Sequence, residues 1–61
     1  MSMFSAQKIR EAIERCNAQC VSAIANHEPQ ERIDGMRAGI DKLHQWLAKA
    51  EREEREAAAR N

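Results

Sequence analysis

The residues that could do chemistry in this 61-residue sequence are two cysteines, two histidines and a set of arginines. Cys16 and Cys20 are four residues apart, which would place both thiols on one face of a helix. Two thiolates together with His27 or His44 would make a ligand set that zinc accepts. In the helical hairpin predicted below, both histidines fall one to two turns away from the thiols. We therefore expect no metal site, and we interpret the cysteines as small core residues.

Catalytic patterns are missing from the sequence. A nucleophilic cysteine needs an accessible, electropositive setting, whereas Cys16 and Cys20 belong to an apolar repeat. There is no HExxH pattern and no serine nucleophile elbow. The two glycines fall within a helical pattern instead of a phosphate-binding loop after a strand. We expect no catalytic residues, no cofactor and no enzymatic activity.

The elements that position these residues are predicted from two apolar repeats. Both repeats alternate steps of three and four, which is the heptad spacing of a helix with one apolar side. The first repeat consists of Ile9, Ile13, Cys16, Cys20, Ala23 and His27. The second consists of Ile33, Met36, Ile40, Leu43, Leu47 and Ala50. The sequence thus predicts two helices whose apolar sides face each other.

Local signals set the helix boundaries. Ser5 is a good N-cap, and Phe4 with Ile9 would form the hydrophobic staple that accompanies it. Pro29 disfavours helix at the residue before it and suits the first turn of a new helix. We predict helices over about 5–26 and 29–58, and so short a connection forces them antiparallel. The predicted fold class is all-α, an antiparallel αα-hairpin that assembles as a helical bundle.

The antiparallel arrangement predicts which residues meet across the hairpin. The expected pairs are Ala23 with Ile33, Cys20 with Met36, Cys16 with Ile40, Ile13 with Leu43, and Ile9 with Leu47. Residues 1–50 would form the hairpin. Residues 51–61 would form a charged helical C-terminal extension that overhangs it, solvated and supported by acid-base pairs four residues apart.

One flank of the predicted hairpin is polar, because each flank of an antiparallel pair collects residues from both helices. Away from the turn, this polar flank contains Arg10, Asn17, Arg37 and His44. Guanidinium groups bind phosphate or carboxylate through paired hydrogen bonds, so the flank is a candidate ligand-binding site for an anion. The alternative is a solvated surface on which the arginines pair with acids such as Glu14 and Asp41.

The other flank carries small or neutral residues and the single tryptophan. It consists of Ala12, Gln19, Gly35, Gly39 and Trp46. Small residues let another helix approach closely, and a Trp beside them would bury its rings in the contact. We expect this flank to be an oligomer interface. Two alternatives stay open: Trp46 covers the core of a monomer, and the glycines are merely tolerated.

Size and charge limit the functional classes. A core of this size is marginal without disulfides, a metal or self-association, so a homo-oligomer, a dimer or higher, is the default expectation. Ten basic residues balance ten acidic ones, which argues against general DNA binding and against an anionic membrane as partner. No apolar run approaches a bilayer span, and residues 1–4 lack a signal-peptide pattern. We expect a cytosolic protein with reduced thiols.

Residues 33–50 resemble the second hairpin helix of small phage proteins that sequester cyclic-nucleotide immune signals, the sponges that counter CBASS and Thoeris defences. The resemblance rests on the spacing of Ile33, Arg37, Ile40, Leu47, Lys49 and Ala50. It implies a homo-oligomer, working in the host cytosol, that holds a cyclic nucleotide or another anionic small molecule between hairpins. Arg37 would contact the phosphate, and the polar flank would add Arg10 and His44.

The length, the hairpin and the Pro-containing turn also look like the small co-chaperones of type III secretion needle subunits. That resemblance implies a protein partner, a larger chaperone of helical repeats, with Trp46 as the anchor residue. A purely structural bundle protein is a third interpretation. Sequestration of a nucleotide signal by a non-enzymatic homo-oligomer is the expected function, with a protein-binding adaptor as the alternative.

Overall fold

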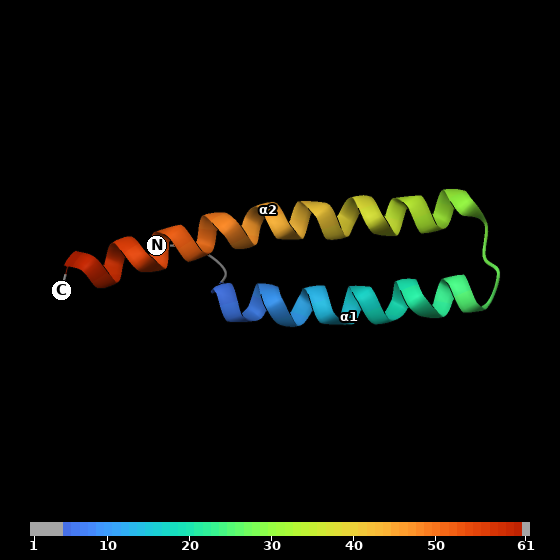
Figure 1. Ribbon diagram of the computed structural model, residues 1–61, viewed down its shortest axis with the longest axis horizontal. Helices are drawn as coiled ribbons and strands as arrows, with labels where there is room; N and C mark the ends of the chain where they lie inside the picture. The colour runs from blue at the N-terminus through green and yellow to red at the C-terminus, as the bar shows by residue number, and fades with distance from the viewer. Residues whose placement is uncertain (1–4, 61) are drawn as a thin grey trace.

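The computed structural model describes residues 5–60, which form two antiparallel helices lying side by side (Figure 1). α1 spans Ala6–Ala25 and α2 spans Gln30–Arg60. Within the described range there is no strand, and the molecule measures 50 × 15 × 14 Å. The predicted all-α antiparallel hairpin is confirmed, with both helices within two residues of their expected bounds. Assembly as a bundle remains a prediction.

The start of α1 is fixed by the predicted cap. Ser5 has extended backbone angles, and its side chain accepts a hydrogen bond from the Lys8 N–H at 3.3 Å. A serine at this position satisfies one of the N–H groups that have no partner within the helix. Phe4, the other half of the expected hydrophobic staple, lies outside the described residues.

The turn is built from backbone hydrogen bonds at the end of α1. The Glu28 N–H donates to the Ala23 carbonyl at 3.0 Å, and the His27 N–H donates to the Ile24 carbonyl at 3.1 Å. This pair of bonds is the Schellman motif, which requires a residue in the left-handed conformation at the position that His27 occupies. His27 has φ 56° and is the only non-glycine residue with positive φ in the described range. The sequence prediction did not foresee this role.

α2 begins immediately after the turn. The Pro29 carbonyl accepts hydrogen bonds from the N–H groups of Arg32, at 3.0 Å, and Ile33, at 3.2 Å. Glu28, just before the helix, pairs with Arg32 at 2.9 Å. A carboxylate at this point also complements the positive end of the helix dipole. Pro29 therefore lies one residue before α2, whereas it was predicted to be the first residue of the helix.

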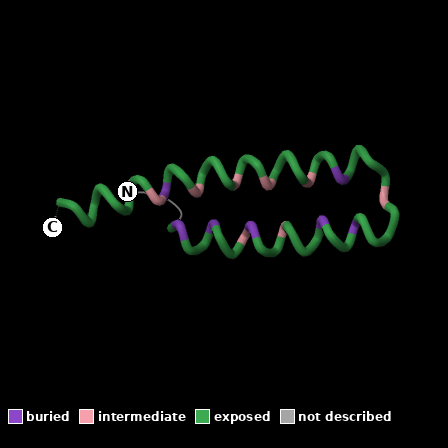
Figure 2. Tube along the Cα trace, in the orientation of Figure 1, coloured by how far each residue is buried: buried purple, intermediate pink, exposed green. Residues whose placement is uncertain are grey.

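The core is a single seam between the helices, and Figure 2 shows the buried and half-buried positions turned inward along both of them. It divides into two clusters that group the members of four of the five expected pairs; Cys16, expected opposite Ile40, is half-buried and belongs to neither cluster. The cluster near the turn contains Cys20, Ala23 and Ile33, with Met36 and Ile40 packed against them. The cluster at the open end contains Ala6, Ile9, Ile13 and Ala50, with Leu43 and Leu47 packed against them.

The C-terminal part of α2 contacts the beginning of α1, which the sequence prediction missed. Glu54 accepts a hydrogen bond from the Ala6 N–H at 2.8 Å, and Glu51 pairs with Arg10 at 2.9 Å. Residues 51–54 therefore belong to the hairpin, and the part of α2 that extends past these contacts begins at Arg55. The expected pairs of Glu51 with Arg55 and of Glu56 with Arg60 are not among the ion pairs of the described residues.

Candidate functional site

An apolar groove lies beside Trp46 on the surface of the hairpin. The groove lies between the two helices near the open end, has a volume of about 290 Å³, and is lined by Lys8, Ile9, Ala12, Arg15, Leu43 and Trp46. Trp46 is 52% exposed. An indole that forms one wall of an open groove does not close the core, so the interpretation of Trp46 as a lid does not describe this hairpin.

The rim of this groove is basic. Lys8 and Arg15 line it from α1. The ion pairs in the described part of the chain involve other cations, so neither side chain has a carboxylate within 4 Å. An apolar floor with two unpaired cations at its edge favours an occupant that is apolar on one side and acidic at its margin. The sequence prediction did not identify either residue.

Gly35 and Gly39 are exposed on the same flank, as predicted. A Cβ atom added at either glycine would meet nothing within 4 Å. Contacts within the hairpin therefore do not explain two glycines in one helix, each of which costs roughly 1 kcal/mol relative to alanine. Gln19 is exposed and Ala12 is half-buried at the groove. We name Ala12, Gln19, Gly35, Gly39 and Trp46 together the Trp46 face.

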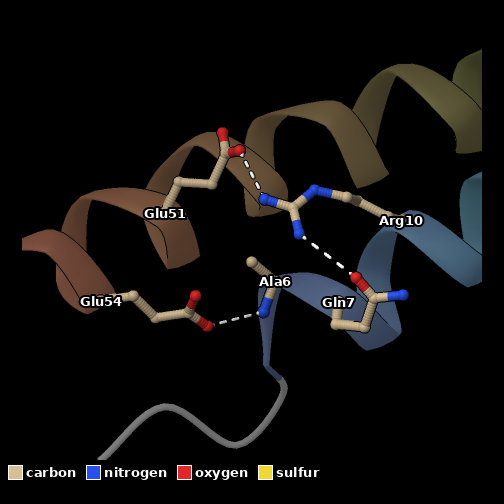
Figure 3. Close-up of polar contacts among 5 residues, drawn as sticks. All are labelled: Ala6, Gln7, Arg10, Glu51 and Glu54. Carbon is tan, nitrogen blue, oxygen red and sulfur yellow. Dashed lines mark hydrogen bonds and ion pairs between the residues drawn. The ribbon is translucent and has the colours of Figure 1, made fainter.

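The polar flank is not assembled into one site. Figure 3 shows the Arg10 guanidinium held between two groups, the Glu51 carboxylate at 2.9 Å and the Gln7 side-chain oxygen at 3.4 Å. In the register set by the core clusters, Arg10 lies level with residue 46 of α2. Arg37 is then about 14 Å away along the axis, at 1.5 Å per residue. The Arg10 guanidinium is also bound to Glu51, which is 14 residues from Arg37 along α2, about 21 Å at 1.5 Å per residue, so the two guanidinium groups do not converge on one phosphate.

The remaining predicted ligand-binding residues, Asn17, Arg37 and His44, are all exposed. Arg37 has no carboxylate within 4 Å in the described part of the chain, in contrast to Arg10. A second, shallow hollow of about 340 Å³ lies on this flank, lined by Arg10, Glu51, Glu54, Arg55 and Ala58. Because this hollow is lined by both arginine and glutamate side chains, its charge does not favour binding of an anion.

Two exposed apolar residues near the turn were missed by the sequence prediction. Val21 is 67% exposed and Ile24 is 46% exposed. Ile24 follows Asn17 by seven residues, as Asn17 follows Arg10, so the polar flank becomes apolar toward the turn. This spacing of seven residues is the signal from which the apolar end of the flank could have been predicted.

The cysteines lie in the core seam. Cys20 is buried and Cys16 is half-buried, and both are free thiols. Residues 5–60 contain no group of three or more His, Cys, Asp or Glu side chains able to hold a metal ion. The position of Cys20 beside Ala23 and Ile33 agrees with its interpretation as a core residue.

The fold is a small helical hairpin with an open apolar groove on one flank. A scan against protein-family profiles, a search of curated proteins and a search of solved structures found no match. Neither helix of the described chain is both long and apolar enough to cross a membrane.

Proposed function

We propose that this protein is a non-enzymatic binding protein that works as a homo-oligomer assembled through the Trp46 face. The observation that carries the proposal is the half-exposed indole beside an open apolar groove. Trp is the residue most often found at the energetic centre of protein interfaces. Two glycines without neighbours on the same face would let a second backbone approach closely.

The small core supports the same proposal. Among residues 5–60 the buried apolar residues are few, and four of the seven are alanine or cysteine, namely Ala6, Cys20, Ala23 and Ala50. A chain of this length gains little stability from a single core, and self-association is one of the usual ways to supplement it. Burying Trp46 between copies would add one large aromatic side chain per subunit to the apolar surface removed from water.

The test is the mass of the native protein before and after Trp46→Ala. We expect wild type to be an oligomer by sedimentation velocity, and Trp46→Ala to weaken the association by roughly 2 kcal/mol or more, which is the usual cost of truncating an interface hot spot. Val21→Ala is the matched control, because Val21 is at least as exposed but lies away from the Trp46 face. A mass that Trp46→Ala leaves unchanged contradicts the proposed interface.

Sequestration of an anionic nucleotide is the more specific form of this proposal. It is supported by Arg37, whose guanidinium is exposed and has no carboxylate within 4 Å in the described chain. Such a group is available to form charge-assisted, paired hydrogen bonds with a phosphate. It lies on the polar flank, so assembly through the Trp46 face leaves it accessible.

Calorimetric titration with cyclic dinucleotides tests this form of the proposal. We expect Arg37→Ala to weaken binding about tenfold or more, the usual effect of losing a charged hydrogen bond, without changing the oligomer. Arg10→Ala should weaken it less, because the Arg10 guanidinium is already paired with Glu51. Wild type that binds none of these nucleotides, or an Arg37→Ala isotherm equal to wild type, removes the nucleotide from the proposal.

The adaptor alternative uses the same Trp46 face for a different protein. It predicts that the isolated chain is a monomer and folds poorly, because the partner would cover the groove. A stable wild-type homo-oligomer with a cooperative thermal transition argues against it.

A further inference from the structure

α2 presents a second repeat of heptad spacing on the side that bears Trp46. Steps of four and three connect Gly35, Gly39, Lys42, Trp46, Lys49 and Glu53. Gly35 and Gly39 begin this row, and Lys42 and Lys49 lie on either side of the indole. The row becomes acidic at Glu53, beside the beginning of α1. With 31 residues against 20, α2 also extends past its partner helix. Continued by the same steps, the row reaches Glu56 and Arg60, on the stretch from Arg55 onward that α1 does not cover.

The charges along this row are complementary to each other. Lys42 precedes Trp46 by about one turn, close to the groove whose rim already carries Lys8 and Arg15. Glu53 lies on the same row near the C-terminal end. Glu51 and Glu54 are held by α1, whereas Glu53 and Lys42 have no oppositely charged partner within 4 Å in the described chain.

Building on the proposed self-association, we infer that the groove beside Trp46 is covered by residues 49–53 of α2 from a second copy. The two copies are related by a two-fold axis, with their α2 helices antiparallel. When the axis passes midway between Trp46 and Lys49, Lys42 meets Glu53 of the second copy. Trp46 then meets Lys49 of the second copy, a cation–π pair. Two-fold symmetry makes each contact twice.

The charges along the row favour this register of the two α2 helices over the registers next to it. Shifting the axis by half a turn toward Gly39 would oppose Lys42 to Lys49 of the second copy, and like charges at an interface suppress association. Shifting it by the same amount toward Glu53 would lose the ion pair. In the inferred register the uncovered end of α2 lies along Gly35 and Gly39. A Cβ atom at either glycine has nothing within 4 Å, so both have room for a second helix.

Charge reversal tests the register directly. In the full-length protein, Lys42→Glu opposes two glutamates across the interface, and Glu53→Lys opposes two lysines. We expect each variant alone to dimerise about tenfold more weakly than wild type or worse, because rim charges facing like charges oppose association. An equimolar mixture of the two variants, one carrying a purification tag, should form a heterodimer with an affinity near that of wild type. In the mixture, both contacts join opposite charges.

Two controls match the charge changes on the other side of α2. Asp41→Lys changes the charge as Glu53→Lys does, and Arg55→Glu changes it as Lys42→Glu does. Both should leave the dimerisation constant within about threefold of wild type, since exposed charges away from an interface contribute little. Circular dichroism checks that every variant keeps its helix content.

The outcomes separate this inference from the proposed function. If wild type dimerises and Trp46→Ala weakens the dimer, but the mixture gains nothing over the single variants, the register is wrong and self-association stands. If wild type is monomeric at all concentrations, both fail, and an acidic partner or small anion becomes the occupant of the groove. Recovery in the mixture supports the inferred dimer, because only reciprocal contacts between residues 42 and 53 restore both pairs.

Discussion

The two ends of the hairpin are closed by different means. At the turn, the contacts that end α1 join residues within five positions of each other, and the left-handed His27 lets the backbone complete them. At the open end, the contacts join residues more than 40 positions apart, from Arg10 to Glu51 and from Ala6 to Glu54. The turn is therefore specified locally, whereas the open end forms only when the two helices are in register.

The packing at the two ends differs in the same sense. Ala6 is fully buried and Ala50 nearly so, and both belong to the open-end cluster. Alanines on facing helices allow the backbones to come close, and that closeness brings the start of α1 within reach of Glu54. In the turn cluster the small residues, Cys20 and Ala23, both belong to α1, and α2 contributes only the larger Ile33, Met36 and Ile40. Perturbing small residues at the open end should thus affect packing and polar contacts together.

Ala50→Leu should have the largest effect on this comparison. Three additional carbon atoms beside Ala6 would force the helices apart, at a cost of about 1–3 kcal/mol for overpacking a core. Urea unfolding followed by circular dichroism, at a fixed protein concentration because association shifts the midpoint, would measure it. Ala48→Leu adds the same atoms at an exposed position and should change stability by less than about 0.5 kcal/mol. Equal effects of the two substitutions would show that the open end is not closely packed.

Glu54→Ala should have an intermediate effect. It removes the acceptor of the Ala6 N–H and a negative charge from the positive end of the α1 dipole, which together are expected to cost about 1 kcal/mol. Glu56→Ala is the control, because Glu56 is exposed and has no ion pair in the described chain. Hydrogen exchange of the first α1 amides should accelerate in Glu54→Ala alone. Unchanged protection there would mean that Ser5 caps α1 without help.

Much of the fold could be predicted from the sequence because its information is periodic. The two apolar repeats fix the facing sides, and the short connection around Pro29 fixes their antiparallel direction, so the core clusters follow. The same repeats extend further than was predicted. Ala6 precedes Ile9 by three, and Glu54 follows Ala50 by four, which places both on the seam. An alanine and a glutamate were not recognised as seam residues because neither is strongly apolar.

The candidate site was less predictable than the fold. Trp46 and the glycines could be assigned to one flank by helical spacing alone. Whether the indole covers the core depends on how closely the helices approach, and a linear pattern does not contain that distance. The pairing of Arg10 with Glu51 likewise depends on a contact across 41 positions. Lys8 and Arg15 were overlooked because long basic side chains on a helix are ordinary until a groove lies between them.

His27→Gly should have the smallest effect in this comparison and the opposite sign. Left-handed backbone is strained for residues with a Cβ, and glycine is the usual residue at this position of a Schellman motif. We expect the glycine variant to be more stable by about 0.5–1 kcal/mol, the strain relief being partly offset by the greater entropy of glycine in the unfolded chain. His27→Ala is the control, because alanine keeps the Cβ atom and should give no gain. If both variants gain equally, relief of backbone strain is not the cause. The turn is closed by local bonds, so His27→Gly should not act on the open end. The hydrogen-exchange protection of the first α1 amides, measured relative to that of global unfolding, should therefore stay the same.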